Sequence, residues 1–512
     1  MKRILVVLLV LALMLPGFGM AEDAPKAGGV LKIASGNVTQ IGSPPHVATY
    51  MEQQAVSPAL ETLARYGEGG RLVPWLASEW TLDPDGLEMT ITLREGVKFH
   101  DGTAFDAEAV KWNLEYFKAS GRNEISAVET IDVTDATHLT LHMSSWSSSI
   151  DENVLYTAGL MISPTFAQNS DEDTLFATPV GTGPFRFVRW DRGEKLVYEK
   201  NDEYWIEGKP YLDGVEMHFF SDANTTATAL MTGVIDACVT GDTTVDEIML
   251  GNGWTPVNGA LPTSGLMRGV FFCSNDPEDP FYDIRVRQAF CYAMDVPTIA
   301  SMYAKSGIAT YTNQWNIPGS WAYNDETVGY PYDPAKAKEL LAEAGYAGGV
   351  EINYYYNANS TLFAQVGQVM QAYAAQVGIT LNLNPIAQAL QDEMVGLNGK
   401  WDGIMEWAAQ GKPYCAQLYA RAFQEGGPRF SGSSLKPDDV LDLIEQGITA
   451  KTQAESEPIL KELSRKIIDD YCLLLPFCVG TNCMYASRDV MDHHLAEFSG
   501  SQWTPEDCWL NR

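Results

Sequence analysis

Seven histidines and eight cysteines are the residues best suited to bind a metal or to carry out redox chemistry in this chain. Only His493 and His494 are adjacent, and neighbours in a strand or helix point in different directions, so they form no ready chelate. No CxxC occurs, which disfavours a zinc ribbon or a thioredoxin-like site. We expect no metal site and no cofactor. The cysteines could form up to four disulfides or remain buried free thiols.

Common catalytic motifs are missing as well. The sequence contains no HExxH, no GxSxG and no GxxxxGK[ST]. Gly181 and Gly183 lack the third glycine of a dinucleotide-binding fingerprint. We therefore expect a protein that is not an enzyme.

The composition excludes further classes of function. The chain has 512 residues, with 34 basic and 66 acidic side chains and a formal net charge of −32. A surface this acidic repels phosphate backbones and anionic lipid, so neither nucleic acid nor a membrane surface is an expected partner.

The first 21 residues have the pattern of a secretory signal peptide. Lys2 and Arg3 precede twelve uncharged residues at 4–15, and Gly19 and Ala21 place small residues at positions −3 and −1 of a cleavage site. The apolar run is too short to span a membrane, and no later run is long enough. No cysteine lies at the cleavage junction, where a lipid anchor would need one. We expect a soluble periplasmic monomer without a lipid anchor or stable membrane insertion.

The elements that must position any functional residues alternate between strands and helices. Alternating apolar and polar residues predict a strand at 89–93 and a hairpin within 129–143. Three helices are predicted to begin after the capping residues Asp106, Asp283 and Asp333. Further strands are expected at 30–34, 352–356 and 379–383, and further helices at 57–63 and 365–377. This interleaving predicts the α/β class.

Eight sequence blocks, in this order along the chain, resemble the family 5 extracellular solute-binding proteins, the peptide- and nickel-type binding proteins of ABC importers. The blocks are LVPWLASEW (72–80), LREGVKFHDGT (93–103), AVKWN (109–113), PVGTGPF (179–185), NDEYW (201–205), GKPYLD (208–213), FYDIRVRQA (281–289) and YDPAKAKELL (332–341). The glycines in these blocks suit turns, which indicates that the blocks are scaffold and not ligand contacts.

The resemblance implies a two-lobed fold of the periplasmic-binding-protein type (type II) with an inserted subdomain. Lobe one would comprise 28–66, 180–275 and 483–512, with the insertion at 67–179, and lobe two would comprise 276–482. The chain would cross between the lobes near 275–280 and 476–483.

The resemblance also implies a function: a ligand is captured between the lobes and delivered to the permease subunits of an importer. A secreted hydrolase or peptide-processing enzyme on the same scaffold is the alternative, and a secreted holdase or adhesin is a third hypothesis. A binding protein would release its small molecule unchanged, whereas an enzyme would release product.

The position of residues in this fold suggests the ligand contacts. In peptide-binding relatives a Trp-x-x-Asp run supplies an aspartate that pairs with the peptide ammonium. Here the tryptophan is Trp407, and the position of the aspartate, three residues later, holds the neutral Gln410. Ordinary free-amine di- and tripeptides are therefore not the expected ligand, and an amino-acid derivative is an alternative. Glu406 could restore the charge, but it should face away if Trp407 faces the ligand. Arg268 is suited to a carboxylate. The other candidates are His46, Tyr50, Tyr355, Asn357, Gln388 and Tyr414.

Overall fold

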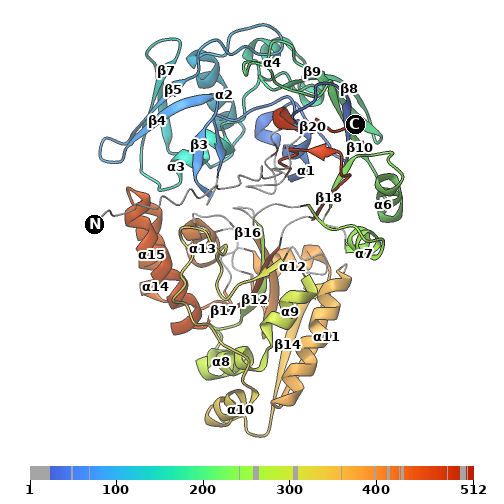
Figure 1. Cartoon of the computed structure of the whole chain (residues 1–512). Helices are drawn as coiled ribbons and strands as arrows, with labels where there is room; N and C mark the ends of the chain where they lie inside the picture. Colours follow the sequence, from blue (N-terminus) through green and yellow to red (C-terminus); the bar gives the residue numbers. More distant parts are fainter. Residues whose placement is uncertain are drawn as a thin grey trace, which may run out of the picture.

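The computed structural model describes residues 24–47, 50–67, 70–240, 243–257, 265–303, 309–358, 360–396, 399–411, 415–425, 427, 432–480, 483–495, 503 and 505–512. The expected signal peptide lies outside these residues. The chain forms two lobes, drawn one above the other in Figure 1.

Lobe one is built on a six-stranded mixed sheet. Its strands, in spatial order, are β18 (Cys483–Ala486), β11 (Ala237–Thr240), β1 (Val30–Ser35), β10 (Gly214–Phe219), β9 (Lys195–Lys200) and β8 (Phe185–Asp191). The central strand β1 pairs in parallel with β10 and β11. The lobe also contains α1 (Tyr50–Val56), α4 (Pro164–Asn169), α5 (Glu172–Ala177), α6 (Ala223–Met231), α7 (Thr243–Gly251) and the short pairs β2 (Ala64–Tyr66) with β3 (Leu72–Pro74) and β19 (Val490–Met491) with β20 (Trp509–Leu510).

A second, antiparallel sheet lies beside lobe one and forms an inserted subdomain. Its strands are β4 (Ala77–Asp83), β5 (Glu88–Leu93), β7 (His138–Met143) and β6 (Val128–Val133). Helix α2 (Ala107–Ala119) packs on this sheet, and Asp106 caps it by accepting a hydrogen bond from the Ala109 amide. Both the capped helix and the hairpin of β6 and β7 agree with the sequence prediction. The short helix α3 (Ile150–Glu152) follows β7.

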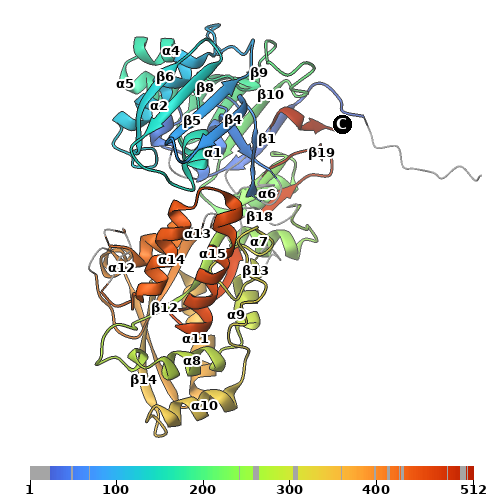
Figure 2. The same cartoon turned by 90° about the vertical axis from the view of Figure 1, so that its left-hand side faces the viewer.

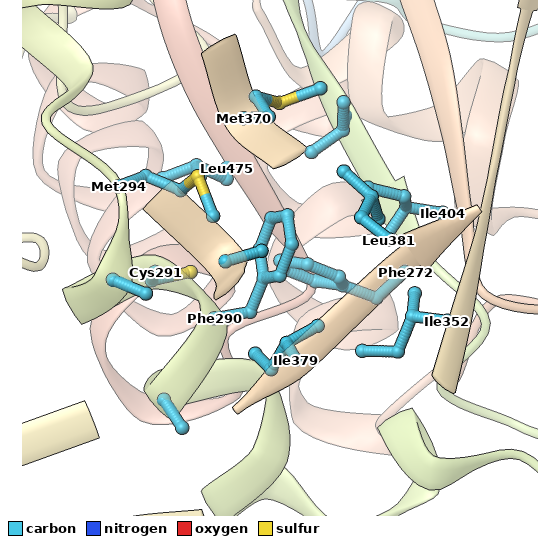
Figure 3. Packing of buried hydrophobic residues seen from close by; sticks show 14 of the residues in the cluster. Phe272, Phe290, Cys291, Met294, Ile352, Met370, Ile379, Leu381, Ile404 and Leu475 are labelled. Carbon is cyan, nitrogen blue, oxygen red and sulfur yellow. The ribbon is translucent and has the colours of Figure 1, made fainter. Parts of the chain in front are cut away.

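Lobe two is built on another six-stranded sheet. Its strands, in spatial order, are β13 (Ala309–Tyr311), β17 (Leu474–Gly480), β12 (Gly265–Phe272), β16 (Ile404–Gly411), β14 (Val350–Asn357) and β15 (Ile379–Ile386). One face packs on α8 (Ile284–Ala293), α9 (Val296–Tyr303), α10 (Pro334–Glu343) and α11 (Thr361–Gln376). Figure 3 shows part of this core, in which Phe272, Phe290 and Leu475 come from three different elements. The opposite face packs on α13 (Cys415–Phe423), α14 (Asp438–Thr449) and α15 (Gln453–Arg465), and α12 (Gln388–Val395) follows β15.

Two sequence predictions about elements are wrong. Lobe one does not extend to residue 275, because β12 pairs with β16 and β17 in the sheet of lobe two. The first crossing therefore lies before Gly265 and not near 275–280. Nor does a helix form at 57–63, since α1 ends at Val56 and the chain turns there. The second crossing does fall within the predicted 476–483, between the end of β17 and the start of β18.

Three of the eight family blocks meet at one buried carboxylate in lobe one, that of Glu61. The Glu61 side chain accepts hydrogen bonds from the indole of Trp75 at 2.8 Å, the hydroxyl of Tyr204 at 2.8 Å, the hydroxyl of Thr182 at 2.8 Å and the indole of Trp205 at 3.1 Å. Arg65 adds an ion pair at 3.6 Å. Blocks 72–80, 179–185 and 201–205 thus each supply a donor, which agrees with their reading as scaffold.

The seven cysteines with described side chains are buried and are thiols that form no disulfide: Cys238, Cys273, Cys291, Cys472, Cys478, Cys483 and Cys508. Sγ of Cys291 and Sγ of Cys472 lie 3.5 Å apart in the core of lobe two. The sequence left open whether the cysteines form disulfides or remain buried thiols, and the described cysteines are buried thiols.

Candidate functional site

The carboxyl ends of three parallel strands meet at one edge of the lobe-two sheet. Strand β14 pairs in parallel with both β15 and β16. At the same edge Gly265, which begins β12, pairs with Gly411, and Gly480 at the end of β17 pairs with Leu266. Figure 1 shows that this edge faces lobe one. Ligands of open α/β sheets bind beyond the carboxyl ends of the strands, so this edge is the candidate site.

Two predicted contacts, Asn357 and Gln388, come together at this edge. Asn357 ends β14, Gln388 begins α12, and the amide of Asn357 donates a hydrogen bond to the Gln388 carbonyl oxygen. The Gln388 amide in turn donates to Asp392 at 3.0 Å. These hydrogen bonds hold the polar groups of the two side chains at the candidate edge, where a ligand could form hydrogen bonds with them.

Arg268 lies on β12, and its guanidinium lies near two aromatic rings. The guanidinium carbon is 5.9 Å from the centre of the Tyr303 ring and 5.3 Å from that of Phe363. Tyr303 ends α9 and Phe363 lies in the first turn of α11. These cation–π contacts orient the guanidinium. Arg268 is half-buried, and no described residue accepts a hydrogen bond from it or forms an ion pair with it.

Glu406 lies beneath Arg268 on the same face of the sheet, since its partner Val270 is two residues from Arg268. Its side chain is buried and accepts a hydrogen bond from the Tyr303 hydroxyl at 2.6 Å and another from Tyr354. Burial raises the pKa of Glu406 to about 7, whereas the two tyrosine hydroxyls and the positive charge of Arg268 act in the opposite direction. Sequence reasoning treated Glu406 only as a replacement charge. The signal that it missed was an acid within a strand otherwise rich in apolar residues.

Trp407 points to the opposite face of β16 from Glu406, as predicted for neighbours in a strand. Its ring centre lies 4.2 Å from that of Phe271 and 5.8 Å from that of Trp315. The indole is half-buried against the core beneath α13, α14 and α15. This geometry gives Trp407 a packing role, and its contact with a ligand stays a prediction.

The remaining candidates are not brought to this edge by any described contact. The hydroxyl of Tyr355 donates to Asp402 at 2.6 Å, and Asp402 precedes the amino end of β16. His46, in lobe one, contacts Ser43 at 2.9 Å and the Phe176 ring at 4.9 Å. The side chains of Tyr50 and Gln410 and all of Tyr414 lie outside the described residues.

The buried Glu406 predicts a pH dependence of stability. Its pKa rises from 4.5 to about 7 on folding, so its contribution is fully present below pH ~4.5 and is lost as the pH rises through about 7. The shift corresponds to about 3 kcal/mol. Urea unfolding of the native protein and of Glu406→Gln should therefore give free energies whose difference changes between pH 5 and 8.

The matched control is Glu203→Gln, because the Glu203 side chain is 63% exposed. The native protein and this control should lose stability in parallel over the same pH range. A difference between the native protein and Glu406→Gln that stays constant with pH would contradict a raised pKa for Glu406.

A set of hydrogen bonds joins the inserted subdomain to lobe two, and we call it the interlobe bridge. Its residues are Trp146, Ser148 and Ser149 on one side and Gln417 and residues 447–450 on the other. The Trp146 indole donates to the Ala450 carbonyl at 2.8 Å, and the Ser148 hydroxyl donates to the Gly447 carbonyl at 2.8 Å. The Ser148 amide donates to Ile448, and Gln417 donates to Ser149. Figures 1 and 2 show α14 and α15 side by side, reaching lobe one with one end. The bridge therefore stabilises this arrangement of the lobes.

We expect the double variant Trp146→Phe, Ser148→Ala to populate this arrangement less. It removes two hydrogen bonds across the lobes at about 1 kcal/mol each, so without ligand the radius of gyration from small-angle X-ray scattering should increase. Ser126→Ala is the control, since it removes a 2.8 Å bond from Ser126 to Asn123 within the subdomain. Equal radii for the native protein and the double variant would show that the bridge contributes nothing.

Neither a metal-binding cluster nor a membrane-spanning helix occurs in the described part of the chain. No group of three or more His, Cys, Asp or Glu side chains there could hold a metal ion. Among the described helices, none has both the length and the apolar character needed to cross a membrane.

Comparisons with known proteins match most of the chain. A sequence profile of the bacterial extracellular solute-binding proteins, family 5 Middle, matches residues 71–426. The glutathione-binding protein GsiB of Pectobacterium atrosepticum is 31% identical over 340 residues, which cover 65% of this chain and 64% of that protein. GsiB of Shigella flexneri is 31% identical over 455 residues, covering 86% of this chain and 87% of that protein. The solved structure of the ABC transporter substrate-binding protein CtaP from Listeria monocytogenes matches with a TM-score of 0.82 at 19% identity. The match covers 95% of this chain and 100% of the CtaP chain.

Proposed function

The chain belongs to family 5 of the bacterial extracellular solute-binding proteins, and we propose that it captures a small peptide-like solute between its lobes and delivers it to the permease of an ABC importer. The two-lobed α/β fold predicted from the sequence is confirmed by the solved structures that match it. The observation that carries the proposal is the candidate edge, which faces lobe one (Figure 1): three strand ends meet there, Asn357 and Gln388 lie at it, and Arg268 lies on β12 three residues from its start at Gly265. A ligand would favour the closed form by its greater affinity for that form.

The class of ligand is proposed from the relatives. Two of them are named glutathione-binding proteins, and we propose that this chain takes a peptide of the same type. This agrees with the expectation against ordinary free-amine peptides. The ammonium of glutathione adjoins a free carboxylate, because its first peptide bond is formed by the glutamate side chain. That ammonium thus brings its own countercharge and needs no aspartate at position 410.

Location, partners and lack of catalysis complete the proposal. The family consists of extracellular binding proteins. We propose that this chain is exported to the periplasm by its first 21 residues, remains monomeric without a lipid anchor, and contacts permease subunits but no nucleic acid. The relatives are binding proteins, so they give no support to the hydrolase alternative, and we propose that the ligand leaves chemically unchanged.

Isothermal titration calorimetry with glutathione, followed by mass spectrometry of the recovered small molecule, tests this function. The titration should give one site per chain, and mass spectrometry should find the recovered glutathione intact. Thermal unfolding with glutathione present should give a raised Tm. Trialanine, a free-amine tripeptide, should bind more weakly. Recovery of hydrolysed glutathione would contradict a binding function and favour an enzyme, and tighter binding of trialanine would contradict the proposed ligand class.

A further inference from the structure

Arg268 differs from the other arginines in its hydrogen bonding. Each of the other buried or half-buried arginines that the structure describes donates to a carboxylate or a carbonyl oxygen: Arg65, Arg94, Arg122, Arg186, Arg285, Arg287 and Arg465. Arg268 is half-buried but has no such acceptor among the described residues. In a chain with 66 acidic side chains, a partly buried guanidinium without an acceptor leaves its strongest interaction unused.

The surroundings of Arg268 hold it ready for an anion. Tyr303 and Phe363 lie beside the guanidinium at 5.9 and 5.3 Å, which restricts its orientation. Among the described residues, none accepts a hydrogen bond from its N–H groups. Glu406, an acid on the same face of the sheet, is instead bound by the hydroxyls of Tyr303 and Tyr354. No ion pair within 4 Å joins Glu406 to Arg268. The acid that could neutralise Arg268 is thus held away from it by two tyrosines.

The position of Arg268 relates this cation to the candidate edge. Its backbone pairs with Ala408, three residues before the end of β16 at Gly411. The two rings beside the guanidinium come from the last residue of α9 and the first turn of α11, and α11 begins just after the carboxyl end of β14. A ligand at this edge would therefore meet the guanidinium.

We propose that Arg268 binds a carboxylate of the ligand, so that this protein selects solutes with a free carboxylate at the end that enters lobe two. The inference rests on the proposed function, because it assumes a ligand at the candidate edge. A guanidinium and a carboxylate can form two parallel hydrogen bonds, which fix orientation as well as charge. The tyrosine-bound Glu406 leaves the charge of Arg268 available for that pairing.

Calorimetry on four proteins with two matched probes tests this inference. The proteins are the native chain, Arg268→Gln, Arg268→Lys and the control Arg285→Gln, since Arg285 pairs with Asp283 on the distant helix α8. The probes are glutathione and its diamide, in which both carboxylates are replaced by carboxamides of the same shape. We expect the native protein to bind the diamide at least ~30-fold more weakly than glutathione.

The four proteins should differ in a defined way. Arg268→Gln should lose a similar factor for glutathione yet bind the diamide as the native protein does, Arg268→Lys should be intermediate, and Arg285→Gln should match the native protein. Unchanged glutathione affinity in Arg268→Gln, or an equal loss for both probes, would overturn the inference. The second result would assign Arg268 a structural role.

Absence of glutathione binding to every variant would reject the proposed ligand class, and a simpler probe then decides the role of Arg268. Succinate at constant ionic strength should raise the Tm of the native protein and of Arg285→Gln but not that of Arg268→Gln. A response to succinate that does not depend on Arg268, or no response at all, would overturn the carboxylate site.

Discussion

Glu61→Ala is expected to lower the free energy of unfolding by about 3–5 kcal/mol, a loss of the size seen when one partner of a buried ionic network is removed. Glu61 is 2% exposed and accepts hydrogen bonds from Thr182, Tyr204 and two tryptophan indoles. Without the carboxylate these buried donors have no acceptor, and each unsatisfied group costs free energy. Arg65 keeps its ion pair with Glu506 at 2.6 Å, so its charge stays partly neutralised.

Urea unfolding followed by circular dichroism measures this effect. Glu203→Ala is the control, because Glu203 lies in the same family block as Tyr204 but is 63% exposed in a 3.5 Å pair with Lys98. Exposed residues of this kind change stability by about 0.5 kcal/mol or less. If Glu61→Ala unfolded at the same urea concentration as this control, the Glu61 network would not be a stabilising centre of lobe one.

Trp407→Ala is expected to cost about 3 kcal/mol, the lower end of the usual range for removing a large aromatic side chain from a core, because the indole is only half-buried. The indole packs on Phe271 and Trp315 beneath α13, α14 and α15. The sequence alone led us to expect that Trp407 lines the ligand pocket. In that role, Trp407→Ala would change the Tm of the ligand-free protein very little. The packing leads to the opposite expectation for the ligand-free protein.

Thermal unfolding without ligand separates these two roles. Tyr311→Ala is the comparison, since Tyr311 also lies on a strand of lobe two but is 45% exposed. We expect Trp407→Ala to lower the Tm well below that of Tyr311→Ala. An unchanged Tm together with a large loss of ligand affinity would restore the pocket-lining role of Trp407.

Elements with local signals could be predicted from the sequence. Asp106, Asp283 and Asp333 cap helices as expected, because a capping side chain needs only the amides of the next turn. The boundary of lobe one could not be predicted in this way. Strand β12 belongs to lobe two because of its pairing with β16 and β17, and such long-range partners leave no mark within residues 265–272.

The candidate site was predicted in part for the same reason. Arg268, Asn357 and Gln388 could be proposed because they adjoin the ends of predicted strands, and the structure brings them to one edge of the sheet. Glu406 could not be recognised as the acid beneath Arg268, because that relation depends on Tyr303 and Tyr354 from two other elements. The bond from the Tyr355 hydroxyl to Asp402, 47 residues further along the chain, could not be predicted either, and ligand contact by Tyr355 stays a prediction.

The most direct test of the proposed function is mass spectrometry of the small molecules released when protein purified under native conditions from its producing cell is denatured. The expected result is one intact peptide-like solute with a free carboxylate, present at close to one molecule per chain and missing from protein that carries Arg268→Gln. A released molecule without a carboxylate, or one present equally in both proteins, would contradict carboxylate selection by Arg268. Fragments of a cleaved solute would contradict capture without catalysis.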